Sequence, residues 1–222
     1  MKEEEVLSLL QDVEDEISEV GFTKHHFNVL EKLSYEKDPY VLAKVAELLV
    51  CAPEVLAESI LVRLAKETDS LVRCEACDSL CNSKSKEIYE LLGKVAAKDK
   101  NGMVRGYASA SLLDVAKNLS CEKDALRRIK ELEKKEKVVF TRIMILTALY
   151  MLGDKNSILP LINYLDTRDY RNRCATVKSL AEITDETNKE MITNVLVTRR
   201  ESEKSYAVVS TIDDALIEIA GR

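Results

Sequence analysis

A single leucine recurs six times along the chain in the same kind of setting. Most copies are preceded by apolar or small residues four and eight positions earlier, and these offsets lie on one face of a helix. A helical stripe that returns at a spacing of 31 to 37 residues is typical of a solenoid of stacked helices. The recurring residues are Leu49, Leu80, Leu112, Leu149, Leu180 and Leu216.

Composition favours the same architecture. The 222 residues are 46% apolar, 5% aromatic and 32% charged, with only six glycines and three prolines, a profile of long amphipathic helices joined by short loops. We therefore predict an all-α fold, an α-solenoid in which antiparallel helix pairs stack into a superhelix as one domain over residues 1–222. The predicted units, about six to seven in number, span residues 2–35, 38–67, 69–98, 101–136, 138–166, 169–200 and 205–220.

The sequence shows no targeting or membrane-spanning segment. No stretch approaches the ~18 uninterrupted apolar residues of a transmembrane helix. The N-terminus is acidic and lacks the basic-then-apolar layout of a secretory signal peptide. We therefore expect a cytoplasmic protein without membrane contact, in which the six cysteines are reduced thiols.

The net charge of −6 is concentrated at one end of the chain. Residues 1–20 contain eight acidic residues and one lysine, whereas the other 202 residues carry 32 basic and 31 acidic residues. The first helix is therefore predicted to be an acidic cap, which repeat arrays need for solubility. An electrostatic docking face for a basic partner is the alternative.

Three segments resemble a known repeat family. Residues 69–80 (DSLVRCEACDSL) and 101–108 (NGMVRGYA) resemble the first helix of a HEAT repeat, of the HEAT-like subtype found in bacterial bilin lyases. Residues 152–161 (LGDKNSILPL) resemble the turn and second helix of the same unit. The resemblance implies stacked helix pairs and a binding role, because this family serves as scaffolds, adaptors, toxin-neutralising proteins and, in a few cases, enzymes.

Charged residues at fixed places in the repeat have structural explanations. Asp38, Asp69 and Asp169 precede predicted helices and can cap their N-termini, whereas Val138 and Ser205 replace this aspartate in two other copies. The resemblance also implies that a recurring arginine pairs with the aspartate of a neighbouring repeat and forms a ladder. A row of ligand-binding arginines is the alternative. The ladder residues are Arg73, Arg105, Arg142 and Arg173.

Cys74, Cys77 and Cys81 lie at i, i+3 and i+7, so their sulfurs could converge on one helical face as metal ligands. The equivalent positions of the other copies hold mostly apolar or small residues. This pattern favours packing, because free cysteine packs as a small hydrophobe. We therefore predict no metal, no cofactor and no disulfide.

Motifs for catalysis and nucleic-acid binding are scarce. The only histidines, His25 and His26, are adjacent, so they diverge by about 100° on a helix and cannot chelate together; we expect both to be partly exposed. The chain has no glycine-rich phosphate loop and no nucleophile elbow. It also lacks tryptophan and a basic excess, which a DNA-glycosylase-like groove would be expected to offer. We therefore predict that the protein is not an enzyme and does not bind nucleic acid.

The stretch 163–173 is the first candidate for a protein-binding surface. Tyr164, Arg168, Tyr170 and Arg171 gather around the turn between two predicted units, and tyrosine and arginine dominate interface hot spots. An ordinary turn that only carries part of the arginine ladder is the alternative.

The charged stretch 122–137 is the second candidate region. Arg127 and Arg128 lie on the second helix one unit earlier, where the leucine spacing lengthens to 37 residues. Departures from a repeat period often map to the binding face. A solvated helix with mixed charges is the alternative.

The sequence thus predicts a non-catalytic scaffold or adaptor that binds a partner protein on its solenoid surface. A toxin-neutralising immunity protein is a special case, which rests on family analogy alone. The alternatives are a HEAT-like enzyme, either bilin-lyase-like or DNA-glycosylase-like, and a nucleic-acid-binding solenoid.

Overall fold

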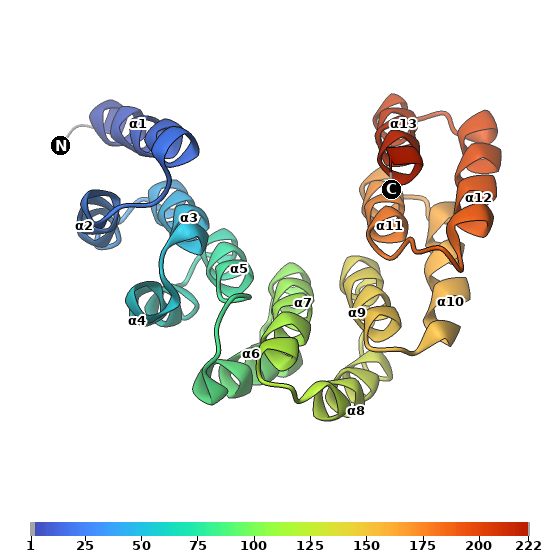
Figure 1. Cartoon of the computed structure of the whole chain (residues 1–222), viewed down its shortest axis with the longest axis horizontal. Coiled ribbons are helices and arrows are strands. Elements are labelled where there is room, and N and C mark those ends of the chain that lie inside the picture. Colours follow the sequence, from blue (N-terminus) through green and yellow to red (C-terminus); the bar gives the residue numbers. More distant parts are fainter. Residues whose placement is uncertain (1–2, 222) are drawn as a thin grey trace. The chain divides into compact units, whose positions relative to one another are not determined.

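The computed structural model describes residues 3–221, and this part of the chain is all-helical, as predicted (Figure 1). It contains thirteen α-helices and no β-strand. None of the described helices is both long enough and apolar enough to cross a membrane. The α-helices are α1 (Glu3–Val20), α2 (Lys24–Leu33), α3 (Pro39–Leu48), α4 (Glu54–Leu64), α5 (Ser70–Ser79), α6 (Lys86–Lys98), α7 (Gly102–Asn118), α8 (Glu122–Glu133), α9 (Val139–Met151), α10 (Ile158–Ile162), α11 (Tyr170–Glu182), α12 (Lys189–Ser202) and α13 (Tyr206–Gly221).

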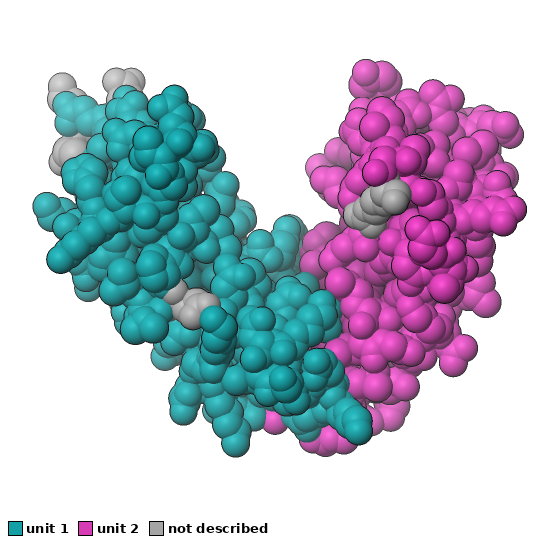
Figure 2. Space-filling model, viewed as in Figure 1, with its two compact units in different colours: residues 1–125 teal, residues 126–222 magenta. Residues whose placement is uncertain are grey.

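The chain divides into two compact units, Met1–Ala125 (unit 1) and Leu126–Arg222 (unit 2), with the boundary inside α8 (Figure 2). In unit 1, the first helices α1, α3, α5 and α7 lie side by side in one layer, and the second helices α2, α4 and α6 pack against them (Figure 1). Unit 2 repeats this arrangement with the first helices α9, α11 and α13 and the second helices α10 and α12. The single domain expected over the whole chain stays a prediction.

The second helix of the unit predicted over residues 138–166 is broken into three pieces. Only α10 is α-helical, and it lies between the 3-10 helices η2 (Lys155–Ser157) and η3 (Asn163–Asp166). Pro160 lies inside α10 and has no N–H group to donate. Short 3-10 turns commonly finish such helices, because they satisfy backbone groups in a tighter turn.

The recurring leucines form the core, as the stripe predicts. Five of the six are at most 3% exposed. Leu216 is the exception, since it is half-buried. It lies on α13, which packs on α11 and α12 and has no second helix of its own among the described residues. The buried copies are Leu49, Leu80, Leu112, Leu149 and Leu180.

The predicted aspartate caps are confirmed. Asp38, Asp69 and Asp169 each accept hydrogen bonds from backbone N–H groups in the first turn of α3, α5 and α11. Val138 has no such side chain at the start of α9. Instead, Glu136 Oε1 accepts hydrogen bonds at 2.8 Å from the N–H groups of residues 137 and 138. The Glu136 carboxylate thus holds the loop before α9, where the capping side chain is missing.

Arg73 is a buried junction between two repeats of unit 1. It donates from Nε and Nη2 to the carboxylate of Asp99 at 2.8 and 3.0 Å, and from Nη1 to the carbonyl oxygens of Glu67 and Thr68. The sequence predicted a capping aspartate as the partner. The partner is instead Asp99, which lies two residues before Asn101, the N-cap of α7. The capping aspartates already accept hydrogen bonds from the backbone of their own helices. Arg73 thus joins the loop before α5 to the loop before α7.

Arg173 makes the same junction in unit 2. Its Nε and Nη2 donate to Glu203 at 2.8 and 2.9 Å, and its Nη1 donates to the carbonyl oxygens of Thr167 and Arg168. Burial alone would raise the pKa of Glu203. Hydrogen bonds from Arg173, the Ser205 N–H and Arg199 outweigh this cost and lower the pKa to about 2. The carboxylate is therefore held in its charged form by the fold.

His26 is buried, so the expectation of two partly exposed histidines is wrong for this residue. Its Nδ1 accepts from the N–H of Thr23 at 3.1 Å, and its Nε2 lies 3.0 Å from the carboxylate of Glu16. Thr23 in turn caps α2 with its hydroxyl. His26 therefore fastens the start of α2 to the acidic helix α1, whereas His25 is exposed.

Replacing Leu112 tests the role of the leucine stripe. Leu112 is fully buried, so Leu112→Ala should lower the free energy of unfolding by about 2–5 kcal/mol through lost burial and a cavity. Leu216→Ala is the matched control, and it should cost clearly less because Leu216 is half-buried. Urea unfolding followed by circular dichroism measures both. Equal losses would contradict the assignment of the stripe to the core.

Glu203→Gln should lower the free energy of unfolding at neutral pH by about 3–5 kcal/mol, because buried Arg173 then loses its counter-ion. Asp213→Asn breaks the exposed pair with Arg200 and should cost far less, because exposed ion pairs contribute little to stability. Because folding lowers the pKa of Glu203 from 4.5 to about 2, its contribution is present above pH 4.5 and lost as the pH falls toward 2. Calorimetry should therefore show the difference between wild type and Glu203→Gln shrinking in acid; a constant difference would refute the pairing.

Candidate protein-binding surface

The start of α11 brings three of the predicted binding residues together. Arg168, Tyr170 and Arg171 are all exposed there, and 42% of Tyr170 is accessible to solvent. The guanidinium carbon of Arg171 lies 5.4 Å from the centre of the Tyr170 ring, within the range of a cation–π contact. The structure therefore presents an aromatic ring and a cation as one exposed pair.

Hydrogen bonds fix the backbone that carries this exposed pair, and we call this backbone its rigid base. Asp169 accepts a hydrogen bond from the N–H of Arg171 at 3.0 Å and so caps the helix. Directly before it, the carbonyl oxygens of Thr167 and Arg168 accept hydrogen bonds from buried Arg173. Side chains on a fixed backbone lose less conformational entropy on binding than side chains on a mobile loop. The turn that carries part of the arginine ladder, considered above as the alternative to a binding surface, therefore holds the exposed pair in place.

Tyr164 lies apart from this pair, on η3. It is half-buried, and burial, together with the nearby Glu133 carboxylate, raises its pKa even though Arg142 opposes the shift. Arg142 Nη2 donates to Glu133 Oε1 at 2.7 Å, while its buried Nε has no hydrogen-bond partner. Tyr164 therefore belongs to a junction of α8, α9 and η3, and no described contact joins it to Tyr170.

Arg127 and Arg128 lie on a third segment, α8. Arg127 is exposed and Arg128 is half-buried. The same helix is fixed to the turn before η2 by an ion pair of 2.8 Å between Lys130 and Asp154. The six predicted residues thus come from three segments of unit 2, and only those at the start of α11 form one compact group.

The cysteine cluster lies in the packed interior of unit 1. Cys74 and Cys77 are buried, and Cys81 is half-buried. Burial raises the pKa of Cys74 and of Cys77 to about 12, so both remain thiols at neutral pH, whereas metals bind the thiolate. Among the described residues, no group of three or more histidine, cysteine or acidic side chains is placed to hold a metal ion.

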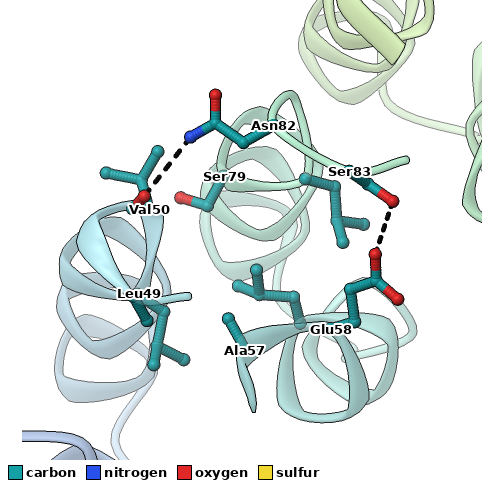
Figure 3. Close-up of a pocket in the computed structure, with 10 residues that line it drawn as sticks. Leu49, Val50, Ala57, Glu58, Ser79, Asn82 and Ser83 are labelled. Atoms are coloured by element: carbon teal, nitrogen blue, oxygen red, sulfur yellow. Dashed lines mark hydrogen bonds between the residues drawn. The ribbon is translucent and has the colours of Figure 1, made fainter. Parts of the chain in front are cut away.

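A small pocket lies between η1 (Leu49–Cys51), α4 and the end of α5 with the turn that follows it (Figure 3). Its polar side chains are engaged with the protein: Ser83 donates to Glu58 at 2.5 Å, and Asn82 donates to the carbonyl oxygen of Val50 at 3.4 Å. The remaining walls are apolar, including Leu49 and Ala57, and the space holds no more than about one water molecule. We assign it to imperfect packing between repeats.

Three exposed apolar side chains of unit 1 were not predicted from the sequence. Tyr40, Leu71 and Met103 are 61%, 46% and 49% exposed. Each stands two residues after the N-cap of a first helix, in α3, α5 and α7. The signal was present in the sequence, as an apolar residue two positions after each of the capping residues Asp38, Asp69 and Asn101.

Comparisons with known proteins bear on the fold. No protein-family model matches the chain, and no curated protein matches its sequence. Among solved structures, it is similar to the complex of CpcE and CpcF of phycocyanin lyase from Nostoc sp. PCC7120, with a TM-score of 0.58 and 17% identity over 89% of this chain and 83% of that chain. The crystal structure of an engineered protein matches with a TM-score of 0.45 and 19% identity over 88% and 96% of the two chains. The likeness to the CpcE–CpcF complex shows a shared helical fold.

This likeness corrects one prediction. We inferred from missing motifs that the chain is not an enzyme, yet the fold it shares occurs in a phycocyanin lyase. A phosphate loop and a nucleophile elbow serve particular reactions, and their absence excludes those reactions alone. The prediction that the chain is not an enzyme is therefore wrong.

Thiol reactivity tests the placement of the cysteines. Cys51 is exposed, so it should react rapidly with a chromogenic disulfide reagent in the folded protein. Cys74 and Cys77 should react only after unfolding, because they are buried and protonated. Cys51→Ser should remove the fast phase seen by absorbance and leave the slow one. A fast phase that persists in Cys51→Ser would place another thiol at the surface.

Proposed function

We propose that the protein is a helical-repeat subunit that binds a partner protein and works within a complex. The observation that carries this proposal is the exposed Tyr170–Arg171 pair on its rigid base. Tyrosine combines a large apolar area with a hydroxyl group, and arginine adds directional hydrogen bonds, so both residues dominate measured interface energies. Exposed aromatic and charged groups held in place by buried ones are typical of a binding surface.

The fold comparison supports the same proposal. The solved structure that shares the fold is itself a complex of two proteins, CpcE and CpcF. Stacked helices offer long, rigid surfaces that suit the recognition of other proteins. We propose further that the helix pairs are HEAT-like repeats of an α-solenoid. The equivalent junctions of Arg73 with Asp99 and of Arg173 with Glu203 support this assignment.

The comparison also favours a second, narrower function. CpcE and CpcF belong to a phycocyanin lyase, so we propose that the complex formed by this protein has a lyase-type activity on a bilin-carrying protein. Adding phycocyanobilin to the protein together with its co-purified partner and recording the visible spectrum tests this function. A saturable spectral change at about one bilin per chain is expected. An unchanged spectrum would reject the bilin-lyase function and leave partner binding standing.

Partner binding is tested by the double variant Tyr170→Ala, Arg171→Ala. The tagged protein is expressed in its native cell, the co-purified partner is identified by mass spectrometry, and its affinity is measured by calorimetry. The affinity should fall at least about tenfold, or 1.4 kcal/mol. The melting temperature should stay within a few degrees, because surface changes cost about 0.5 kcal/mol or less each. A toxin among the partners would identify the immunity-protein case.

Tyr206→Ala is the matched control for this experiment. Tyr206 occupies the first position of α13, as Tyr170 does in α11, and it is 86% exposed, but alanine follows it in place of arginine. Its removal should leave the affinity unchanged. An unchanged affinity in the double variant, or an equal loss in the control, would place the binding surface elsewhere. Unfolding of the double variant would assign both residues to the structural turn.

A further inference from the structure

One face of unit 1 is left uncovered by the rest of that unit. It is formed by α3, α5 and α7 on the side opposite the second helices, and no described helix of unit 1 packs over it (Figure 1). The exposed apolar residues Tyr40, Leu71 and Met103 occupy the equivalent position of these three helices, two residues after each N-cap. Because equivalent positions of stacked helices present their side chains in the same direction, the three residues form a row. Exposed apolar side chains that gather on one surface mark interaction sites.

Carboxylates follow the apolar row on the same face. Glu75 lies four residues after Leu71, and Asp78 lies one turn further along α5. Asp114 of α7 is close enough to Asp78 to affect its titration, and Glu47 of α3 is close enough to affect that of Glu75. We call Tyr40, Leu71 and Met103 the apolar row, and Glu47, Glu75, Asp78 and Asp114 the acidic row.

The acidic row is only partly neutralised. Lys44 binds Glu47 at 3.0 Å and Glu14 of α1 at 2.8 Å, and Lys117 lies 3.5 Å from Asp114. Among the described residues, Glu75 and Asp78 form no ion pair. The face therefore carries negative charge that the protein itself does not balance.

The fold disfavours the charge of these carboxylates. Partial desolvation, followed by repulsion from Asp114, raises the pKa of Asp78; desolvation, followed by repulsion from Asp78 and Glu47, raises that of Glu75, although Lys44 opposes this second shift. A raised carboxyl pKa means that the charged form is disfavoured in the folded state. A bound cation would offset this cost.

The spacing of the apolar row suits one kind of ligand. Packed helices lie about 8–10 Å apart, so equivalent side chains on α3, α5 and α7 recur at that interval. Two turns of an α-helix, or seven residues, advance about 10.5 Å. A ligand helix lying across the three first helices can thus place one apolar residue on each of them. Basic residues on its flank would then face the acidic row.

We infer that the face made by the apolar row and the acidic row binds a basic amphipathic helix of a partner protein. The apolar row holds the apolar side of that helix, and Glu75 and Asp78 accept hydrogen bonds from its lysine or arginine side chains. Nucleic acids and anionic lipids are excluded from this face by its negative charge. The helix-in-groove mode is a common form of peptide recognition.

This inference deepens the proposed function, since it rests on the protein being a binder of proteins. It names a surface in unit 1, whereas the Tyr170–Arg171 pair lies in unit 2. The two tests use different variants and different ligands. Failure of the peptide experiment below would leave partner binding at α11 intact, and failure of the α11 variants would leave the peptide experiment intact.

The full chain is titrated into a fluorescein-labelled peptide of about 18 residues, long enough to span the row. The peptide has leucines at heptad spacing on one face and lysines on its flanks, and a second peptide replaces every lysine with glutamate. Fluorescence anisotropy should show saturable binding of the lysine peptide. The glutamate peptide should bind at least tenfold more weakly. Raising the salt concentration should weaken the binding of the lysine peptide, because salt screens exposed charges.

Three variants separate the contributions of the two rows. Glu75→Gln with Asp78→Asn should weaken binding of the lysine peptide at least fivefold, and Leu71→Ala should do the same. Glu36→Gln with Glu87→Gln removes two exposed acids outside the face and should leave binding unchanged. The melting temperature of each variant should stay near that of the wild type, which shows that weaker binding does not come from unfolding.

Two results would overturn the inference. One is the absence of saturable binding of the lysine peptide to the wild-type chain. The other is a loss of binding in the Glu36→Gln, Glu87→Gln control that equals the loss in the Glu75→Gln, Asp78→Asn variant. In that case net charge alone would explain the binding, and the face would have no specific role.

Discussion

The structure depends on the mutual burial of helical stripes. A single amphipathic helix cannot hide its own apolar face, so the stripe around Leu80 or Leu112 is buried only when neighbouring helices pack against it. Each repeat therefore relies on its neighbours for stability. Leu216 shows the converse, since the helix that carries it has no second helix of its own among the described residues, and its side chain remains half-buried.

Sequence alone could predict the periodic parts of this fold. The leucine stripe and the aspartate caps depend on spacing within a few residues, which is visible in a sequence. The partner of Arg73 could not be predicted, because Asp99 lies 26 residues away and the choice between it and a capping aspartate of a neighbouring repeat, such as Asp38, depends on how the loops meet. His26 was misjudged for the same reason, since the contact with Glu16 that accompanies its burial comes from another helix.

The candidate surfaces were predicted less well than the fold. Tyr164 and Tyr170 are six residues apart and were grouped together, yet η3 and α11 place them in different surroundings. The apolar row was overlooked because Tyr40, Leu71 and Met103 look unrelated until the capping residues align them. The core positions repeat one residue, leucine. The positions of the apolar row share only their apolar character, which is harder to recognise in a single sequence.

The two kinds of carboxylate in this protein differ in what the fold does to their charge. Glu203 is buried against arginines that lower its pKa to about 2, so the folded protein stabilises its charge. Asp78 and Glu75 have raised pKa values, so the folded protein works against their charge. A residue that stabilises the fold needs no further explanation. A cationic partner would offset the cost of a charge that the fold disfavours and that no ion pair balances.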